Sequence, residues 1–137
     1  NLELARLYHY LFQKTNQKFT VLYALEGYDE ISLTGSTKAF RNHGEQILTP
    51  ADFGVKAISP SEITGGENVA SSAEIFMNII QNKGTKAQTN VVCANAGMAI
   101  ATALQSTPQD GFEKAKESLL SGKAFEALKK LQKLSKQ

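Results

Sequence analysis

The sequence has 137 residues, of which 42% are hydrophobic and 20% are charged; this composition is typical of one folded soluble domain and excludes a disordered chain. Its formal net charge is +2, from 15 basic and 13 acidic residues, and so even a balance does not favour binding to nucleic acid or to an anionic membrane. The one cysteine, Cys93, excludes an internal disulfide framework and a cysteine-based zinc site, and it fits a reducing compartment such as the cytoplasm.

The first residues lack the features of a targeting segment. Asn1-Leu2-Glu3-Leu4 has neither the basic nor the hydrophobic region of a signal peptide. The longest apolar run, residues 91–104, is interrupted by Asn95 and is shorter than the roughly 20 residues that a membrane span needs. An initiator Met is also missing, so we expect that Asn1 is not the native start of the gene product.

The first half of the chain predicts one helix and a few strands. Residues 3–14 predict an amphipathic helix, with an apolar face made of Leu4, Leu7, Tyr8, Leu11 and Phe12. Residues 18–24 predict a strand; they are nearly all apolar after Thr20, so we expect burial on both faces, as in an α/β sheet. Residues 31–49 are β-like, and a turn at residues 42–44 predicts a hairpin.

The second half predicts helices. Thr49-Pro50 and Ser59-Pro60 are helix-start signals for short turns. Four longer helices follow. The first has an apolar face made of Val69, Ala73, Phe76, Met77 and Ile80, and the second, at residues 87–104, is apolar nearly all round. The third runs from Thr107-Pro108 to Gly122 with Phe112, Ala115 and Leu119 inward, and the last has an apolar face made of Phe125, Leu128, Leu131 and Leu134. This order predicts a helix-rich α/β or α+β fold. One buried strand and a hairpin do not complete a sheet, so we expect part of the sheet to be missing or to come from another chain.

Asp29 and Glu30 are the strongest candidates for a functional site. They follow Gly27 in a loop at the C-terminal end of the strand predicted at residues 18–24, which is the end where ligands bind in open α/β sheets. Magnesium is usually held by one or two carboxylates together with substrate phosphates and water. The residues alone leave open a second interpretation, in which the two carboxylates are simply solvated.

The other reactive residues favour structural roles. His9 and His43 have no acidic partner at ligand spacing, and Cys93 is expected to be a small buried side chain. Gly65-Gly66 before a helix favours a turn over anion binding. We expect Asn95, inside an apolar helix, to find hydrogen-bond partners, and Gly97 to allow another backbone to pack closely. The C-terminal lysines are expected on the polar face of a short helix: Lys129, Lys130, Lys133 and Lys136.

Five segments in order resemble the C-terminal half of the anthranilate phosphoribosyltransferase family. The matching segments are Glu26-Gly27-Tyr28-Asp29-Glu30 with the following Ser32 and Gly35-Ser36-Thr37, then Thr49-Pro50-Ala51-Asp52-Phe53-Gly54, Gly65-Gly66-Glu67-Asn68, Asn95-Ala96-Gly97 and Ser121-Gly122-Lys123-Ala124. The resemblance implies an α/β fold: the C-terminal part of a catalytic domain of the nucleoside phosphorylase/phosphoribosyltransferase type, with an incomplete central sheet and several helices, over residues 1–137.

The resemblance also implies an activity and a metal. The family transfers a phosphoribosyl group from phosphoribosyl pyrophosphate to anthranilate in tryptophan biosynthesis, in the cytoplasm, with Mg²⁺ held by the residues that match Asp29 and Glu30. It implies a homodimer formed through a helical domain that is not in this sequence, and no nucleic-acid or membrane partner. No catalytic residue is assigned within residues 1–137.

The sequence departs from the family in several places. Tyr23-Ala24 stands where the strand usually ends in His-Gly. The family's Gly-Thr-Gly-Gly-Asp loop, its Lys-His-Gly-Asn segment and its anthranilate-binding arginine are absent, so we expect a fragment that is inactive alone. Three alternatives stay open: a pyrimidine nucleoside phosphorylase relative, a non-catalytic relative that binds nucleic acid, and a helical interaction module.

Overall fold

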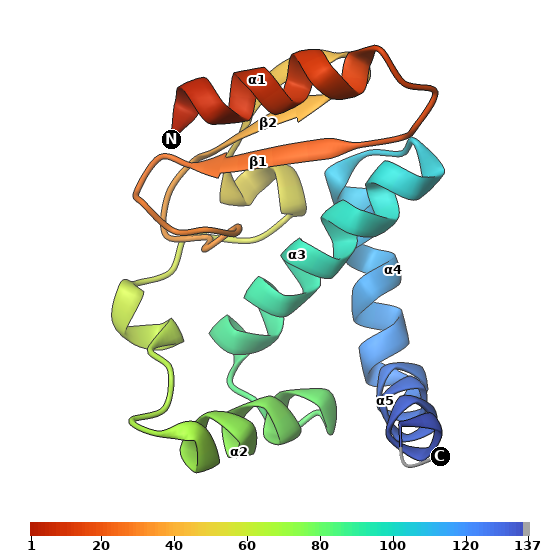
Figure 1. Ribbon diagram of the computed structural model, residues 1–137. Helices are drawn as coiled ribbons and strands as arrows, with labels where there is room; N and C mark the ends of the chain where they lie inside the picture. The colour runs from red at the N-terminus through yellow and green to blue at the C-terminus, as the bar shows by residue number, and fades with distance from the viewer. Residues whose placement is uncertain (136–137) are drawn as a thin grey trace.

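The computed structural model describes residues 1–135, so Lys136 and the last residue of the expected 1–137 unit lie outside the described part. The chain forms a three-stranded sheet with helices on both of its faces (Figure 1). The elements, in chain order, are α1 (Leu2–Gln13), β1 (Thr20–Ala24), β2 (Thr37–Arg41), β3 (Gly44–Leu48), η1 (Pro50–Phe53), η2 (Pro60–Ile63), α2 (Val69–Ile80), α3 (Lys86–Leu104), α4 (Pro108–Leu120) and α5 (Lys123–Leu134).

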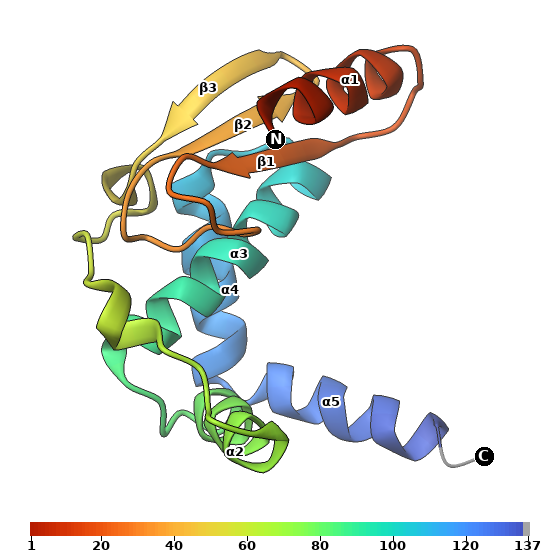
Figure 2. The same cartoon turned by 60° about the vertical axis from the view of Figure 1, so that its left-hand side comes forward.

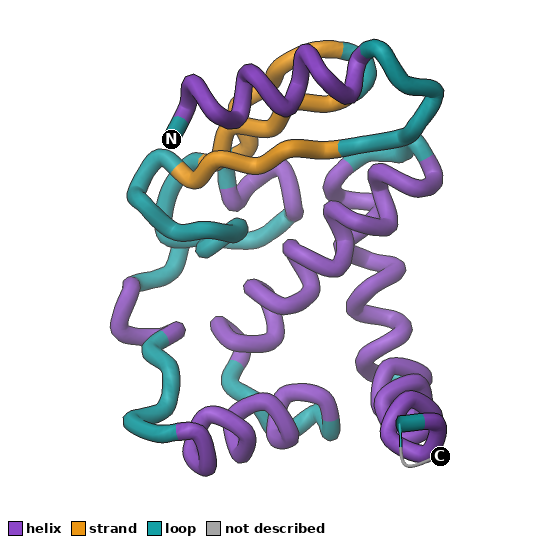
Figure 3. Tube along the Cα trace, in the orientation of Figure 1, coloured by secondary structure: helices purple, strands orange, loops and turns teal. Residues whose placement is uncertain are grey.

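The sheet is antiparallel, in the order β1-β2-β3. Thr20 lies opposite Arg41, and Thr37 lies opposite Leu48, so the predicted hairpin is confirmed. The segment 31–36, predicted to be β-like, is loop instead (Figure 3). Within residues 1–135, one edge of β1 has no strand beside it. Residues 20–23 are therefore half-buried, and the prediction that this strand is buried on both faces is wrong for the described chain.

The core lies between the sheet and the α3–α4 pair, while α1 covers the opposite face (Figures 1 and 2). Ala39 of β2 points into this core, and the next residue, Phe40, lies against the ring of His9 from α1. The two side chains are on opposite faces because neighbouring residues of a strand alternate. Phe112, Ala115 and Leu119 of α4 are buried as predicted.

The C-terminal end of α3 is held by side chains from the sheet layer. Arg41 donates two hydrogen bonds from Nη2, to the carbonyls of Ala101 (3.1 Å) and Ser106 (3.2 Å). Lys18 donates from Nζ to the carbonyl of Ala103 at 2.7 Å. The last carbonyls of a helix have no partner within the helix and carry partial negative charge, so two cations stabilise this end.

The α3–α4 crossing is a direct contact between backbones. A Cβ placed on Gly97 would lie 2.5 Å from the backbone nitrogen of Phe112, and one placed on Gly111 would lie 2.0 Å from the carbonyl oxygen of Gly97. At such distances the hydrogen atom of a glycine fits, whereas a methyl group does not. This confirms the expectation that Gly97 lets another backbone pack closely.

Several predicted apolar faces are exposed. On α1, Leu7 is 64% exposed and the residues turned to the sheet are Ala5 and His9. Val69 of α2 is 87% exposed, and neither α2 nor α5 contains a buried residue. Residues 87–104, expected to be buried because they are apolar nearly all round, are exposed on the face that carries Val92.

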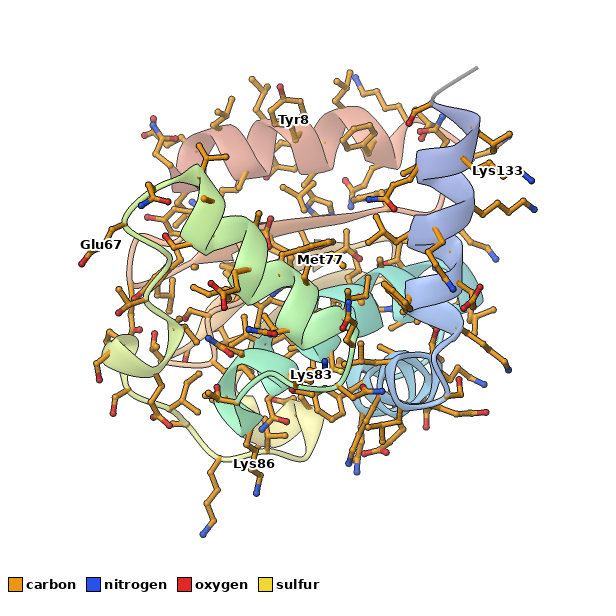
Figure 4. The ribbon with its side chains drawn as sticks, turned by 90° about the horizontal axis from the view of Figure 1, so that it is seen from below. Tyr8, Glu67, Met77, Lys83, Lys86 and Lys133 are labelled. Carbon is orange, nitrogen blue, oxygen red and sulfur yellow. The ribbon has the colours of Figure 1, made fainter. Side chains whose placement is uncertain are left out.

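The view from below shows how these helices are placed. In Figure 4, Glu67, just before α2, and Lys133 of α5 point away from the molecule. An apolar hollow of about 190 Å³ lies among α2, α3, α4 and α5, and its lining includes Phe76 and Cys93. Cys93 is buried, as predicted.

No helix among residues 1–135 is long and apolar enough to cross a bilayer.

Candidate functional site

The candidate site is the loop between β1 and β2, residues 25–36, which is the long loop coloured teal after the first strand in Figure 3. Gly27 has a φ of +86° and nothing within 4 Å of the position of a Cβ, so its backbone conformation, not its size, requires glycine. The chain reverses here, directly after the C-terminal end of β1. Asp29 and Glu30 follow on the exposed part of the loop, in the position predicted from sequence.

Neither carboxylate of the pair has a hydrogen-bond or ion-pair partner within residues 1–135. The ion pairs in this part of the chain are Lys38–Glu45, between β2 and β3, and Glu126–Lys129, within α5, and neither includes Asp29 or Glu30. The carboxylate oxygens of Asp29 and Glu30 are therefore free to bind a cation. No cluster of three or more His, Cys, Asp or Glu residues exists among the described residues, so two carboxylates are what this chain offers to a metal at the site.

The residues after the acidic pair are buried and hydrogen-bonded. Ile31 is 2% exposed and Leu33 is 1% exposed. The Ile31 N–H donates to Oδ1 of Asn95, and the Asn95 Nδ2 donates to the Ile31 carbonyl; these bonds bear out the expectation that Asn95 finds partners. The Leu33 carbonyl accepts from the Ile58 N–H at 3.1 Å. The exposed carboxylates are thus attached to a backbone that is fixed on its C-terminal side.

A small polar network closes the base of the same loop. Thr34 donates a short hydrogen bond from Oγ1 to the Glu26 carboxylate, and its backbone N–H donates to the Ser32 hydroxyl at 3.2 Å. Gly35 lies directly against this carboxylate, since a Cβ there would be 2.1 Å from Glu26 Oε1. This network was not predicted; its signal in the sequence is the alternation of hydroxyl residues at 32 and 34, just after an acidic pair.

Two open hollows meet at the acidic pair. One, of about 350 Å³, is lined by both carboxylates together with Ile63, Val91 and Asn95 among others. The second, of about 400 Å³, lies along α1 and β1 and also reaches Asp29. Asp29 therefore borders both hollows, whereas Glu30 borders only the first. The arrangement fits a cation at these carboxylates, and a ligand that carries negative charge fits there together with such a cation.

The other candidates from the sequence have partners that indicate structural roles. His9 is buried among aromatic rings, and its Nε2 is 3.3 Å from the Arg41 carbonyl. The exposed His43 pairs with Gln105. After Gly65-Gly66, Asn68 caps α2 by accepting from the Ser71 N–H at 3.0 Å. None of these residues lines either hollow at the acidic pair.

Comparison with known proteins gives consistent results. The model of the glycosyl transferase family, a/b domain, matches residues 1–125. The anthranilate phosphoribosyltransferases of Flavobacterium johnsoniae and Cytophaga hutchinsonii are 61% and 46% identical to the chain; the matches cover 98% and 95% of this chain but 41% and 40% of those proteins. The chain thus spans about two fifths of the length of these curated relatives.

Solved structures share the fold. The anthranilate phosphoribosyltransferase from Saccharomyces cerevisiae in complex with PRPP and Mg superposes with a TM-score of 0.80 at 21% identity, over 94% of this chain and 38% of that one. The Thermus thermophilus enzyme gives a TM-score of 0.73 at 25% identity, over 81% of this chain and 33% of that one. These likenesses confirm the predicted α/β fold class and its partial extent.

Proposed function

The chain belongs to the glycosyl transferase family through its a/b domain, and on that premise we propose that it is the C-terminal part of the catalytic domain of an anthranilate phosphoribosyltransferase. The proposed reaction transfers phosphoribosyl from phosphoribosyl pyrophosphate to anthranilate. The observation that carries the proposal is the acidic pair, exposed and unpaired within residues 1–135, at the C-terminal end of β1 and bordered by two hollows.

We propose that Asp29 and Glu30 hold Mg²⁺ together with the pyrophosphate group of the substrate. The two residues fit this role because magnesium prefers carboxylate, phosphate and water oxygens and rarely has a cage made of protein alone. When bound, the ion supplies positive charge that neutralises the pyrophosphate leaving group. The protein binds and orients: the backbone turn at Gly27 and the buried Ile31 side chain fix where the carboxylates are presented.

The test uses Asp29→Asn and Glu30→Gln in the full gene product that contains this sequence. We expect each to raise the Mg²⁺ concentration needed for half-maximal loss of anthranilate fluorescence by at least about tenfold, because the neutral amides are weaker ligands for a hard cation. Glu67→Gln is the control, because Glu67 is exposed and points away from the molecule (Figure 4). An unchanged Mg²⁺ dependence in both site variants would show that the acidic pair is merely solvated.

Residues 1–137 alone are predicted to give no turnover. The relatives are more than twice as long as the matched segment, and the family's pyrophosphate loop has no counterpart among residues 1–137. Loss of anthranilate fluorescence with the isolated polypeptide would contradict this part of the proposal. A homodimer and a cytoplasmic location stay predictions.

A further inference from the structure

Asn95 joins α3 to the loop that carries the acidic pair. Its Oδ1 accepts from the Ile31 N–H at 3.0 Å, and its Nδ2 donates to the Ile31 carbonyl at 2.8 Å. Nδ2 also donates to the Val91 carbonyl one turn earlier in α3, at 3.0 Å. The orientation of the amide is unambiguous, because the Ile31 N–H can only donate and the two carbonyls can only accept.

These bonds fix the backbone next to Glu30. The N–H of Ile31 belongs to the planar peptide group that joins Glu30 to Ile31, and the carbonyl of Ile31 belongs to the next one. Holding both groups sets two successive peptide planes, and the first of these contains the Glu30 Cα, so it fixes the point from which the Glu30 side chain leaves the backbone. These two Asn95–Ile31 hydrogen bonds, here called the clamp, are part-buried, and the buried Ile31 side chain covers them on one side.

Asn95 provides the restraint nearest to the acidic pair along the chain. On the N-terminal side, the nearest hydrogen bond runs from the Gly27 N–H to the Ala24 carbonyl at 3.3 Å, two residues before Asp29. On the C-terminal side, the next anchor is Leu33, whose carbonyl accepts from Ile58. The end of the loop lies beside α3 in Figures 1 and 2, and Asn95 lines the same hollow as both carboxylates.

We propose that Asn95 is a positioning residue for the cation site, acting through the Ile31 backbone on Glu30 without touching the ion. The proposal rests on the proposed function of Asp29 and Glu30. Magnesium demands nearly ideal octahedral geometry, so a carboxylate on a loosened backbone binds it less well. Residues that orient metal ligands typically change metal affinity by about 10- to 100-fold when removed.

The test compares Asn95→Ala with Asn42→Ala in the full gene product. Asn42 makes the same kind of clamp on another loop, accepting from the Phe19 N–H at 3.0 Å and donating to the Gln17 carbonyl at 2.8 Å. The readouts are binding of Mn²⁺, followed by electron paramagnetic resonance with phosphoribosyl pyrophosphate present, and the Mg²⁺ concentration for half-maximal rate. We expect Asn95→Ala to weaken Mn²⁺ binding and to raise the Mg²⁺ concentration for half-maximal rate, each by about tenfold or more. The maximal rate is expected to be regained at saturating metal. Asn42→Ala is expected to leave both readouts unchanged.

A double-mutant cycle separates this proposal from the one it rests on. In a Glu30→Gln background, Asn95→Ala is expected to add little further loss, because both changes act on the same ligand. If neither Asp29→Asn nor Glu30→Gln alters metal binding, the site itself is wrong. If they do and Asn95→Ala matches Asn42→Ala, or adds its full effect to Glu30→Gln, only the role of Asn95 is refuted.

Asn95→Asp replaces the alanine variant if that variant does not fold. It keeps an acceptor for the Ile31 N–H and loses both donors. Its extra negative charge would by itself strengthen binding of a cation. Weaker Mn²⁺ binding in Asn95→Asp therefore supports positioning, and equal or stronger binding overturns it.

Discussion

Gly97→Ala adds one methyl group at the α3–α4 crossing. The new Cβ would lie 2.5 Å from the Phe112 nitrogen, 2.6 Å from the Phe112 Cα and 2.8 Å from the Gly111 carbonyl carbon. Carbon atoms in contact normally lie about 3.5–4.0 Å apart, so α4 must move by about 1 Å. Because the neighbours are backbone atoms, no side-chain rotation relieves the clash.

The free-energy change has two opposing parts. Replacing glycine by alanine inside a helix stabilises by about 1 kcal/mol. Overpacking of a close-packed core costs roughly 1–3 kcal/mol, and the upper end applies because two backbones and the buried rings and side chains around Phe112 and Met98 must shift together. We therefore expect a net loss of about 2 kcal/mol in the free energy of unfolding.

Urea unfolding followed by circular dichroism measures this loss. Gly65→Ala is the matched control, since nothing lies within 4 Å of its Cβ position; it is expected to be neutral or to stabilise by about 0.5 kcal/mol. A Gly97→Ala protein as stable as the unaltered chain would refute the backbone contact. Since Asn95 lies two residues away on α3, Gly97→Ala is also expected to weaken the clamp on Ile31.

Three further outcomes follow from side chains described above. Arg41→Met removes two charge-assisted hydrogen bonds at the end of α3 and is expected to destabilise by about 2–3 kcal/mol in thermal unfolding; an unchanged transition would contradict that role. The hydrogen bond from Lys38 lowers the pKa of Glu45 below its ordinary 4.5, so the stability lost in Glu45→Gln is expected above pH 4.5 and disappears as the pH falls below it; unfolding curves that differ equally at pH 7 and pH 2 would refute this. Burial raises the pKa of the Cys93 thiol, so iodoacetamide at pH 8 is expected to label it slowly in the folded chain and rapidly in urea; equal rates would show an accessible thiol.

Element positions were predictable because their signals are local. Thr107 accepts from the Asp110 N–H at the start of α4, and Asp52 and Glu62 close capping boxes with Thr49 and Ser59 at η1 and η2. Each of these contacts spans three residues, so the amino-acid sequence displays both partners side by side. The turn at residues 42–44 has the same property.

Burial was harder to predict, because apolar spacing identifies a face but not its partner. Leu7 of α1 and Val69 of α2 have the expected spacing, yet both are exposed within residues 1–135. Conversely, His9 was expected to have a structural role, but the sequence did not indicate its burial against Phe19 and Phe40. That environment is created by the sheet, 10 or more residues along the chain.

The location of the candidate site was predictable in part, because some of its signals are local in the sequence. The position of Asp29 and Glu30 in the loop after β1 was predictable because the strand and the glycine that define this loop are sequence neighbours. The Asn95–Ile31 hydrogen bonds join residues 64 positions apart, so no local pattern indicates them. A polar residue inside an apolar helix predicted only that a partner exists.

The hydrogen bonds from Lys18 and Arg41 to the C-terminal end of α3 have a consequence for the order of folding. The α3–α4 hairpin and the β2–β3 hairpin each close over short loops, whereas the contact from Lys18 to Ala103 spans 85 residues and that from Arg41 to Ala101 spans 60. Closing longer loops costs more entropy, and non-local contacts slow folding. We therefore expect the two hairpins to form early and their joining at the end of α3 to set the refolding rate.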